Sequence, residues 1–167
     1  MFRSVILCFA IFAVSISATN VRRCTKNRPF PLSVIIEGCD IMPCEAIKGN
    51  VAVMTATFVG THDGIKAITT QAKASVVGLT VPYILPEDVA NVCANLMDGA
   101  TCPINEGDVV TYSFKFPIDH SEPELSVKME TSFVEDETSE SIACFVVDIK
   151  VKKSDIDDDS LYETNII

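Results

Sequence analysis

The cysteines constrain this chain more than any other feature, because their spacing is typical of disulfides. Seven cysteines occur in 167 residues, and the first, Cys8, lies in an apolar leader. The others form two close pairs and one distant pair: Cys39 and Cys44, Cys93 and Cys102, and Cys24 and Cys144. An even set of cysteines in such a chain predicts an oxidising compartment and a domain stabilised by covalent links.

The N-terminus predicts a secretory signal peptide at residues 1–18. Arg3 precedes an apolar stretch from Val5 to Val14, and the small residues Ser15-Ile16-Ser17-Ala18 follow. This is the order of a signal peptide, and the apolar stretch is shorter than the ~20 residues that cross a bilayer. We expect one domain at 19–152 and an acidic, disordered tail at 153–167.

Charge excludes one class of partner. The chain has 23 acidic and 13 basic residues, which gives a net charge of −10 with the histidines neutral. Nucleic acids require a basic footprint on the protein, so we expect no nucleic-acid partner. We expect the protein to be a monomer.

Between leader and tail, the apolar residues alternate with period two, as in half-buried strands. Leu125, Val127, Met129 and Phe133 are one such set. Strands are expected at 32–38, 51–59, 68–76, 81–85, 110–116, 125–133 and 143–151, and a helical turn at 86–97. Seven or eight short strands predict an all-β, antiparallel sandwich. Periodicity alone is compatible with a filled core and with an open cavity between the sheets.

No catalytic or metal-binding constellation is present in the sequence. His62 and His120 are the only histidines, and neither has a cysteine or a second histidine at ligand spacing. The G-x-S-x-G, H-E-x-x-H and glycine-rich phosphate motifs are absent. We therefore expect no enzyme, no catalytic residue, no metal and no cofactor.

The segment CPINEGDVVTYSFKFPI, Cys102 to Ile118, resembles the ML lipid-recognition domain family of Niemann-Pick type C protein 2 and the group 2 mite allergens. The resemblance includes GLTVPYILP at 78–86 and the order of the cysteines, and it covers about residues 21–151. It implies an immunoglobulin-like sandwich with an internal hydrophobic cavity. It also implies three disulfides: Cys24-Cys144, Cys39-Cys44 and Cys93-Cys102.

The same resemblance implies where a ligand binds. The expected cavity walls are the inward-facing apolar residues Met54, Phe58, Tyr112, Phe114, Phe116, Val127, Met129 and Phe133. In cholesterol-binding members the mouth has a Phe in the V-P-x-P-F-P stretch, a Val after the next strand, and a Tyr. By motif these positions fall on Tyr83, Ile118 and Glu122, so a carboxylate replaces an aromatic ring at the rim.

The resemblance implies a secreted carrier of a sterol or another hydrophobic lipid. A carrier of fatty acids or semiochemicals is the alternative that the changed rim favours. A module that recognises microbial lipids is a further alternative, which the acidic residues Asp119, Glu122 and Glu124 disfavour. A membrane or receptor partner is expected for lipid handover. The expected location is extracellular, because the chain lacks an N-glycosylation sequon and targeting to the lysosome by mannose phosphate requires an N-glycan. The lysosome is the alternative.

Overall fold

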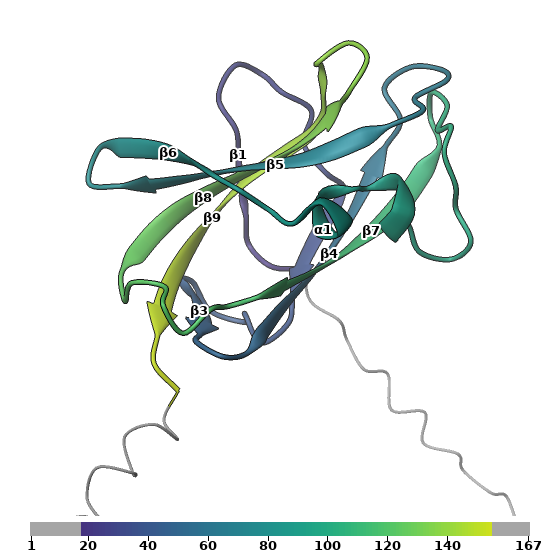
Figure 1. Ribbon diagram of the computed structural model, residues 1–167. Helices are drawn as coiled ribbons and strands as arrows, with labels where there is room; N and C mark the ends of the chain where they lie inside the picture. The colour runs from purple at the N-terminus through teal and green to yellow at the C-terminus, as the bar shows by residue number, and fades with distance from the viewer. Residues whose placement is uncertain (1–17, 155–167) are drawn as a thin grey trace, which may run out of the picture.

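The alternating segments form two facing β-sheets in the computed structural model, which describes residues 18–154 (Figure 1). The strands are β1 (Arg22–Arg23), β2 (Ser33–Ile36), β3 (Cys44–Ile47), β4 (Val51–Val59), β5 (Ile68–Val76), β6 (Leu79–Tyr83), β7 (Val109–Pro117), β8 (Ser126–Glu135) and β9 (Ser141–Lys152). Helix α1 (Glu87–Ala90) and the 3-10 helix η1 (Cys93–Asn95) lie between β6 and β7. The predicted sandwich and the predicted helical turn are confirmed.

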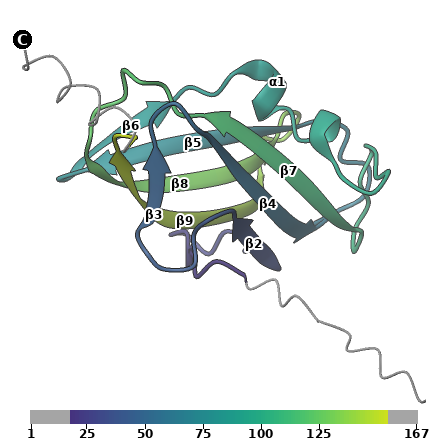
Figure 2. The same cartoon turned by 90° about the horizontal axis from the view of Figure 1, so that it is seen from below.

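The two sheets differ in size. The larger has the order β1-β9-β8-β5-β6, and β3 adds to it by pairing in parallel with the end of β9. The smaller has the order β2-β4-β7, and its pairs are antiparallel. Figure 2 shows β4 and β7 crossing in front of β5, β8 and β9, as in two packed layers.

All seven predicted segments form strands, and two short strands were not predicted. β1 has two residues and β3 has four, so neither carries a measurable alternation. β3 also depends on β9, which lies about a hundred residues later in the chain. Such a pairing leaves no local signal in the sequence.

The predicted β9 segment is apolar on both faces because both faces are covered. Phe145 faces the smaller sheet and belongs to the main core, whereas Cys144 and Val146 face outward. The outward pair is covered by the N-terminal segment, which places Cys24 against them. The structure contains the three disulfides that the resemblance implied.

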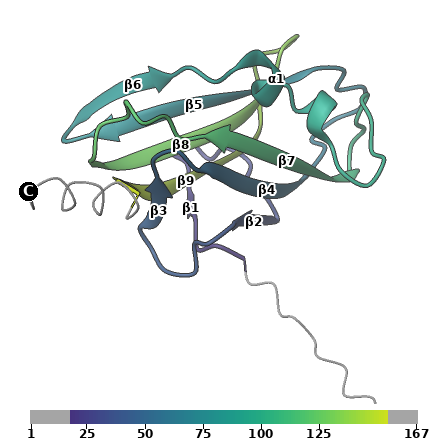
Figure 3. The same ribbon diagram turned by 60° about the horizontal axis from the view of Figure 1, so that its bottom comes forward.

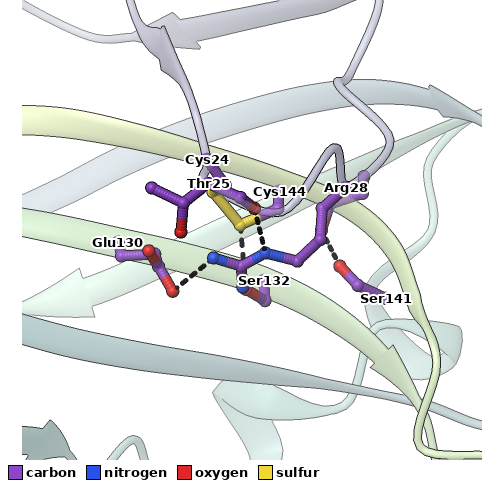
Figure 4. The surroundings of a disulfide bond; sticks show 8 residues. Cys24, Thr25, Arg28, Glu130, Ser132, Ser141 and Cys144 are labelled. Carbon is purple, nitrogen blue, oxygen red and sulfur yellow. Dashed lines mark hydrogen bonds and ion pairs between the residues drawn. A yellow bond between two sulfur atoms is a disulfide. The ribbon is translucent and has the colours of Figure 1, made fainter.

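Arg28 fastens the N-terminal segment to the outer face of β8 (Figure 4). Its guanidinium group donates to the Ser132 hydroxyl at 3.0 Å and to the Thr25 carbonyl at 3.2 Å, and it pairs with the Glu130 carboxylate at 2.8 Å. Three directional contacts from one planar group fix the segment beside the Cys24–Cys144 disulfide.

The β5–β6 hairpin forms the free edge of the larger sheet (Figure 3). Its turn consists of Val77 and Gly78, both with positive φ, at 44° and 83°. Two-residue turns with positive φ match the twist of a hairpin, but a β-branched residue such as Val77 rarely adopts that conformation. The hairpin therefore keeps a strained, fully exposed apolar residue at its tip.

The predicted signal peptide and acidic tail lie almost wholly outside the described residues, so both stay predictions. Within residues 18–154, none of the helices is long and apolar enough to cross a membrane.

Candidate functional site

The register of the strands determines which side chains face the space between the sheets. In the smaller sheet, Met54 pairs with Phe114 and Phe58 with Val110, on the face that carries the core. In the larger sheet, the inward pairs run along β8 and its neighbours: Thr70 with Phe133, Ala74 with Met129, Val127 with Ile149, and Ala72 with Tyr83. All eight predicted wall residues therefore lie on the two inner faces.

One end of the sandwich is closed by a filled core. The wall residues Phe58, Tyr112 and Phe133 are fully buried there. Their rings contact one another edge-on or tilted, with centroids 5.3 Å apart for Phe58 and Phe133 and 5.2 Å apart for Tyr112 and Phe133. At this end the inner face is ordinary close-packed core.

A buried hydroxyl network fixes the closed end. Thr70 Oγ1 donates to the Tyr112 hydroxyl at 3.1 Å, and that hydroxyl donates to the Val89 carbonyl in α1 at 2.7 Å. Burial raises the pKa of Tyr112 to about 12, so the hydroxyl keeps its proton and donates at neutral pH. The network joins both sheets to α1.

The opposite end is open. Phe114, Phe116, Val127 and Met129 also face inward, yet they are only partly buried. On the edge strand β6, Val81 pairs with Ala74 on the inner face and is 44% exposed, and Leu79 is 68% exposed. Figure 1 shows the sheets diverging toward the β5–β6 hairpin. Apolar residues that face the opposite sheet are thus left uncovered at this end.

Aromatic rings connect the closed end to the open end. The Tyr112 and Phe114 centroids are 6.1 Å apart, and Phe114 stacks on Phe116 at 6.2 Å with 20° between the ring planes. Phe116 then meets the Tyr83 ring edge-on at 5.4 Å. These rings form a continuous apolar surface from the core to the rim.

The three predicted mouth residues lie at the open end, but in different environments. Tyr83 and Glu122 are partly buried and contact each other, whereas Ile118 is buried. Backbone hydrogen bonds of Ile118 with Gly49 and Asn50 extend the β4–β7 pairing beyond the end of β7. Ile118 therefore lies buried at the open end and does not form an exposed edge.

The Tyr83 hydroxyl donates to Glu122 Oε1 at 2.9 Å. Burial is the main cause that raises the pKa of Tyr83 well above its ordinary value, followed by the hydrogen bond to Glu122 and the charges of Glu122 and Asp119. Tyr83 therefore remains the donor and Glu122 the acceptor. The bond connects the edge strand of the larger sheet to the loop that leaves β7.

Further acidic side chains lie in the loop that follows β7. The hydroxyl and backbone N–H of Ser121 donate to Asp119 and lower the pKa of its carboxyl group, so Asp119 is ionised at neutral pH. Glu124 pairs with Lys48 at 3.5 Å and with Lys153 at 3.8 Å. Within residues 18–154, Glu122 takes part in no ion pair.

A separate hollow of about 320 Å³ lies on the outer face of the larger sheet. Its lining is mainly polar and charged: Arg28, Gln71, Lys73, Glu130, Ser132, Val134, Ser139 and Ser141. This polar lining distinguishes the hollow from the apolar inner faces of the two sheets.

Sequence reasoning missed some of the inward-facing residues near the open end. Ala72, Ala74 and Val81 face inward beside Met129 and Tyr83, but we predicted none of them as wall residues. The alternation of Ala72 and Ala74 along β5 was visible in the sequence, and both residues are buried. Val81 required the register of β6 with β5, which only the structure gives.

His62, which has no cysteine or second histidine at ligand spacing in the sequence, has an acidic partner in the structure. Its Nε2 atom is 3.1 Å from Oε2 of Glu135, a carboxylate that is buried at the end of β8. Thr138 Oγ1 donates to the same oxygen at 2.5 Å. These contacts fasten the two loops that cover the closed end, far from the mouth.

Comparisons with known proteins agree with this architecture. The family model of the ML domain matches residues 18–151. The chain is 26% identical over 153 residues to "NPC intracellular cholesterol transporter 2 homolog a" of Drosophila melanogaster, covering 91% of this chain and 100% of that protein. It is 28% identical over 108 residues to "Ecdysteroid-regulated 16 kDa protein" of Manduca sexta, covering 65% of this chain and 70% of that protein.

A crystal structure of a Niemann-Pick type C2 protein from the Japanese carpenter ant has a similar fold, with a TM-score of 0.70 and 22% identity. The similarity covers 80% of this chain and 99% of the ant protein. Because the family model spans most of the chain, this protein belongs to the ML domain family.

Proposed function

We propose that this protein is a secreted carrier that binds a sterol or another hydrophobic lipid between its two sheets. The observation that carries the proposal is the gradient of burial along the inner faces. At the closed end, Phe58, Tyr112 and Phe133 are buried. At the open end, Phe116 and Met129 face inward and remain partly exposed. Covering that apolar surface with a ligand is favourable by about 25 cal/mol per Å².

The Drosophila relative supports a lipid ligand, since it is named as an intracellular cholesterol transporter. Three disulfides support folding in an oxidising compartment, as in secreted proteins. Binding and release need no covalent step: the tail enters along the aromatic rings, and the headgroup stays at the rim.

The test uses the full chain and dehydroergosterol, a fluorescent sterol. Ala74 faces inward at the open end, so Ala74→Trp should fill the space and lower sterol affinity by about tenfold or more. Lys73→Trp is the matched control, because Lys73 is the preceding residue and faces outward on the same strand. Equal affinity of folded Ala74→Trp and Lys73→Trp would contradict the proposed site.

We also propose that the β5–β6 hairpin contacts a membrane during lipid handover. Val77 is fully exposed, Leu79 is 68% exposed, and Ile84 just beyond β6 is 89% exposed. These residues flank the mouth, where a ligand would leave. Because the net charge is −10, the contact would be made through apolar side chains and favour zwitterionic lipids. Sedimentation with phosphatidylcholine vesicles tests it.

A further inference from the structure

The hydrogen bond between Tyr83 and Glu122 spans the mouth of the proposed site. Tyr83 belongs to β6, and Glu122 belongs to the loop between β7 and β8. The Tyr83 ring is also held by Phe116, 5.4 Å away. A headgroup that rests at the rim therefore meets this pair, and a ligand that passes the rim has to displace it.

The free hydrogen-bonding capacity of the pair lies on the Glu122 carboxylate. A carboxylate only accepts hydrogen bonds, and its two oxygens offer about four lone-pair sites. Tyr83 occupies one of them, and no basic side chain among residues 18–154 pairs with Glu122. Asp119 adds a second negative charge in the same loop. The rim thus offers acceptors and negative charge to an incoming headgroup.

We propose that Glu122 determines headgroup specificity, and that the carrier prefers lipids with an uncharged hydrogen-bond donor, an alcohol, over lipids with a carboxylate. This inference rests on the proposed lipid site. An alcohol O–H donates to Glu122 beside Tyr83 or in its place. A fatty-acid carboxylate has no proton to donate and brings a like charge next to Glu122 and Asp119, which disfavours binding.

The experiment compares two probes with the same tail, dodecan-1-ol and dodecanoate, as competitors of dehydroergosterol at pH 7.5. The wild-type chain should bind dodecan-1-ol about tenfold or more tightly than dodecanoate. Glu122→Gln keeps an acceptor for Tyr83, removes the charge and adds an amide donor, so the preference should fall close to unity. Glu106→Gln is the matched control: it makes the same charge change in an exposed loop at the closed end.

Tyr83→Phe separates specificity from structural support. It keeps the ring against Phe116 but removes the donor that competes with the ligand for Glu122. The alcohol preference should persist or increase in this variant. A purely structural role of the pair would make Tyr83→Phe and Glu122→Gln behave alike.

The inference would be overturned if the two probes competed equally with dehydroergosterol, or if neither competed. It would also be overturned if Glu122→Gln kept the wild-type ratio of the affinities for dodecan-1-ol and dodecanoate. Failure of dehydroergosterol itself to bind the wild-type chain would instead overturn the proposed function. The two failures are therefore distinguishable.

Discussion

At the scale of single residues, Tyr112 combines a buried ring with a hydroxyl that needs hydrogen-bond partners inside the fold. Its ring lies in the core, and its hydroxyl bonds to the buried Thr70 side chain and to the carbonyl of the partly buried Val89. A buried polar group that loses its partner keeps the cost of desolvation. The hydroxyl therefore stabilises the fold at the closed end.

Tyr112→Phe should lower the free energy of unfolding by about 1–3 kcal/mol, because it leaves the Val89 carbonyl without its donor. Urea unfolding at neutral pH measures this. Tyr83→Phe is the matched control, and it should cost less than Tyr112→Phe because its hydrogen bond is partly exposed. Equal losses would mean that the hydroxyl network does not fix the closed end.

At the scale of elements, the β5–β6 hairpin combines a strained turn with exposed apolar residues. A β-branched residue at positive φ is costly, and such strain is often found where a function requires it. Val77 at the tip fits this description, since a polar residue would suit both the turn and the solvent.

Val77→Asn should stabilise the protein by about 1 kcal/mol, because Asn tolerates the left-handed region. The same variant should bind phosphatidylcholine vesicles more weakly. Thermal unfolding and vesicle sedimentation measure the two effects. Val109→Asn, an exposed strand position without positive φ, should not stabilise. A Val77→Asn protein that binds vesicles as the wild type does would contradict the membrane contact.

The N-terminal segment depends on the three contacts of Arg28. Arg28→Lys keeps the charge but cannot reproduce the planar arrangement, so we expect a loss of about 1–2 kcal/mol in the free energy of unfolding. Arg22 pairs with Asp148 at 2.6 Å on the exposed surface. Arg22→Lys should therefore cost less than about 0.5 kcal/mol. A larger loss at Arg22 would show that the surface pair matters more than the partly buried one.

At the scale of the whole molecule, the disulfides differ in the length of chain that they close. Cys24 and Cys144 are 120 residues apart, whereas Cys39 and Cys44 are 5 apart, and all four are buried. In the loop-entropy model the long link stabilises by about 5 kcal/mol and the short one by about 2 kcal/mol. The double Ser variant of Cys24 and Cys144 should thus unfold at a lower temperature than that of Cys39 and Cys44. The reverse order in calorimetry would contradict this account.

The sequence predicted the sandwich because period-two alternation records which face of each strand is buried. The same alternation predicted that Phe116 and Met129 face inward. Their assignment as cavity walls came from the resemblance to the ML domain family and stays a prediction. The sequence did not predict the contact of Tyr83 with Glu122, which are 39 residues apart and meet through a loop that carries no periodic signal. Nor did it predict that Ile118 is buried, because that follows from backbone bonds to the β3–β4 turn.

A lipid that occupies the open end of the space between the sheets should be crosslinked to the residues that face it. Photocrosslinking with a diazirine sterol, followed by peptide mapping of the full chain, measures where the lipid lies. We expect adducts on inward-facing residues of the open end, Phe116, Met129 and Tyr83. Adducts confined to the outer face, at Gln71 or Lys73, would contradict the account.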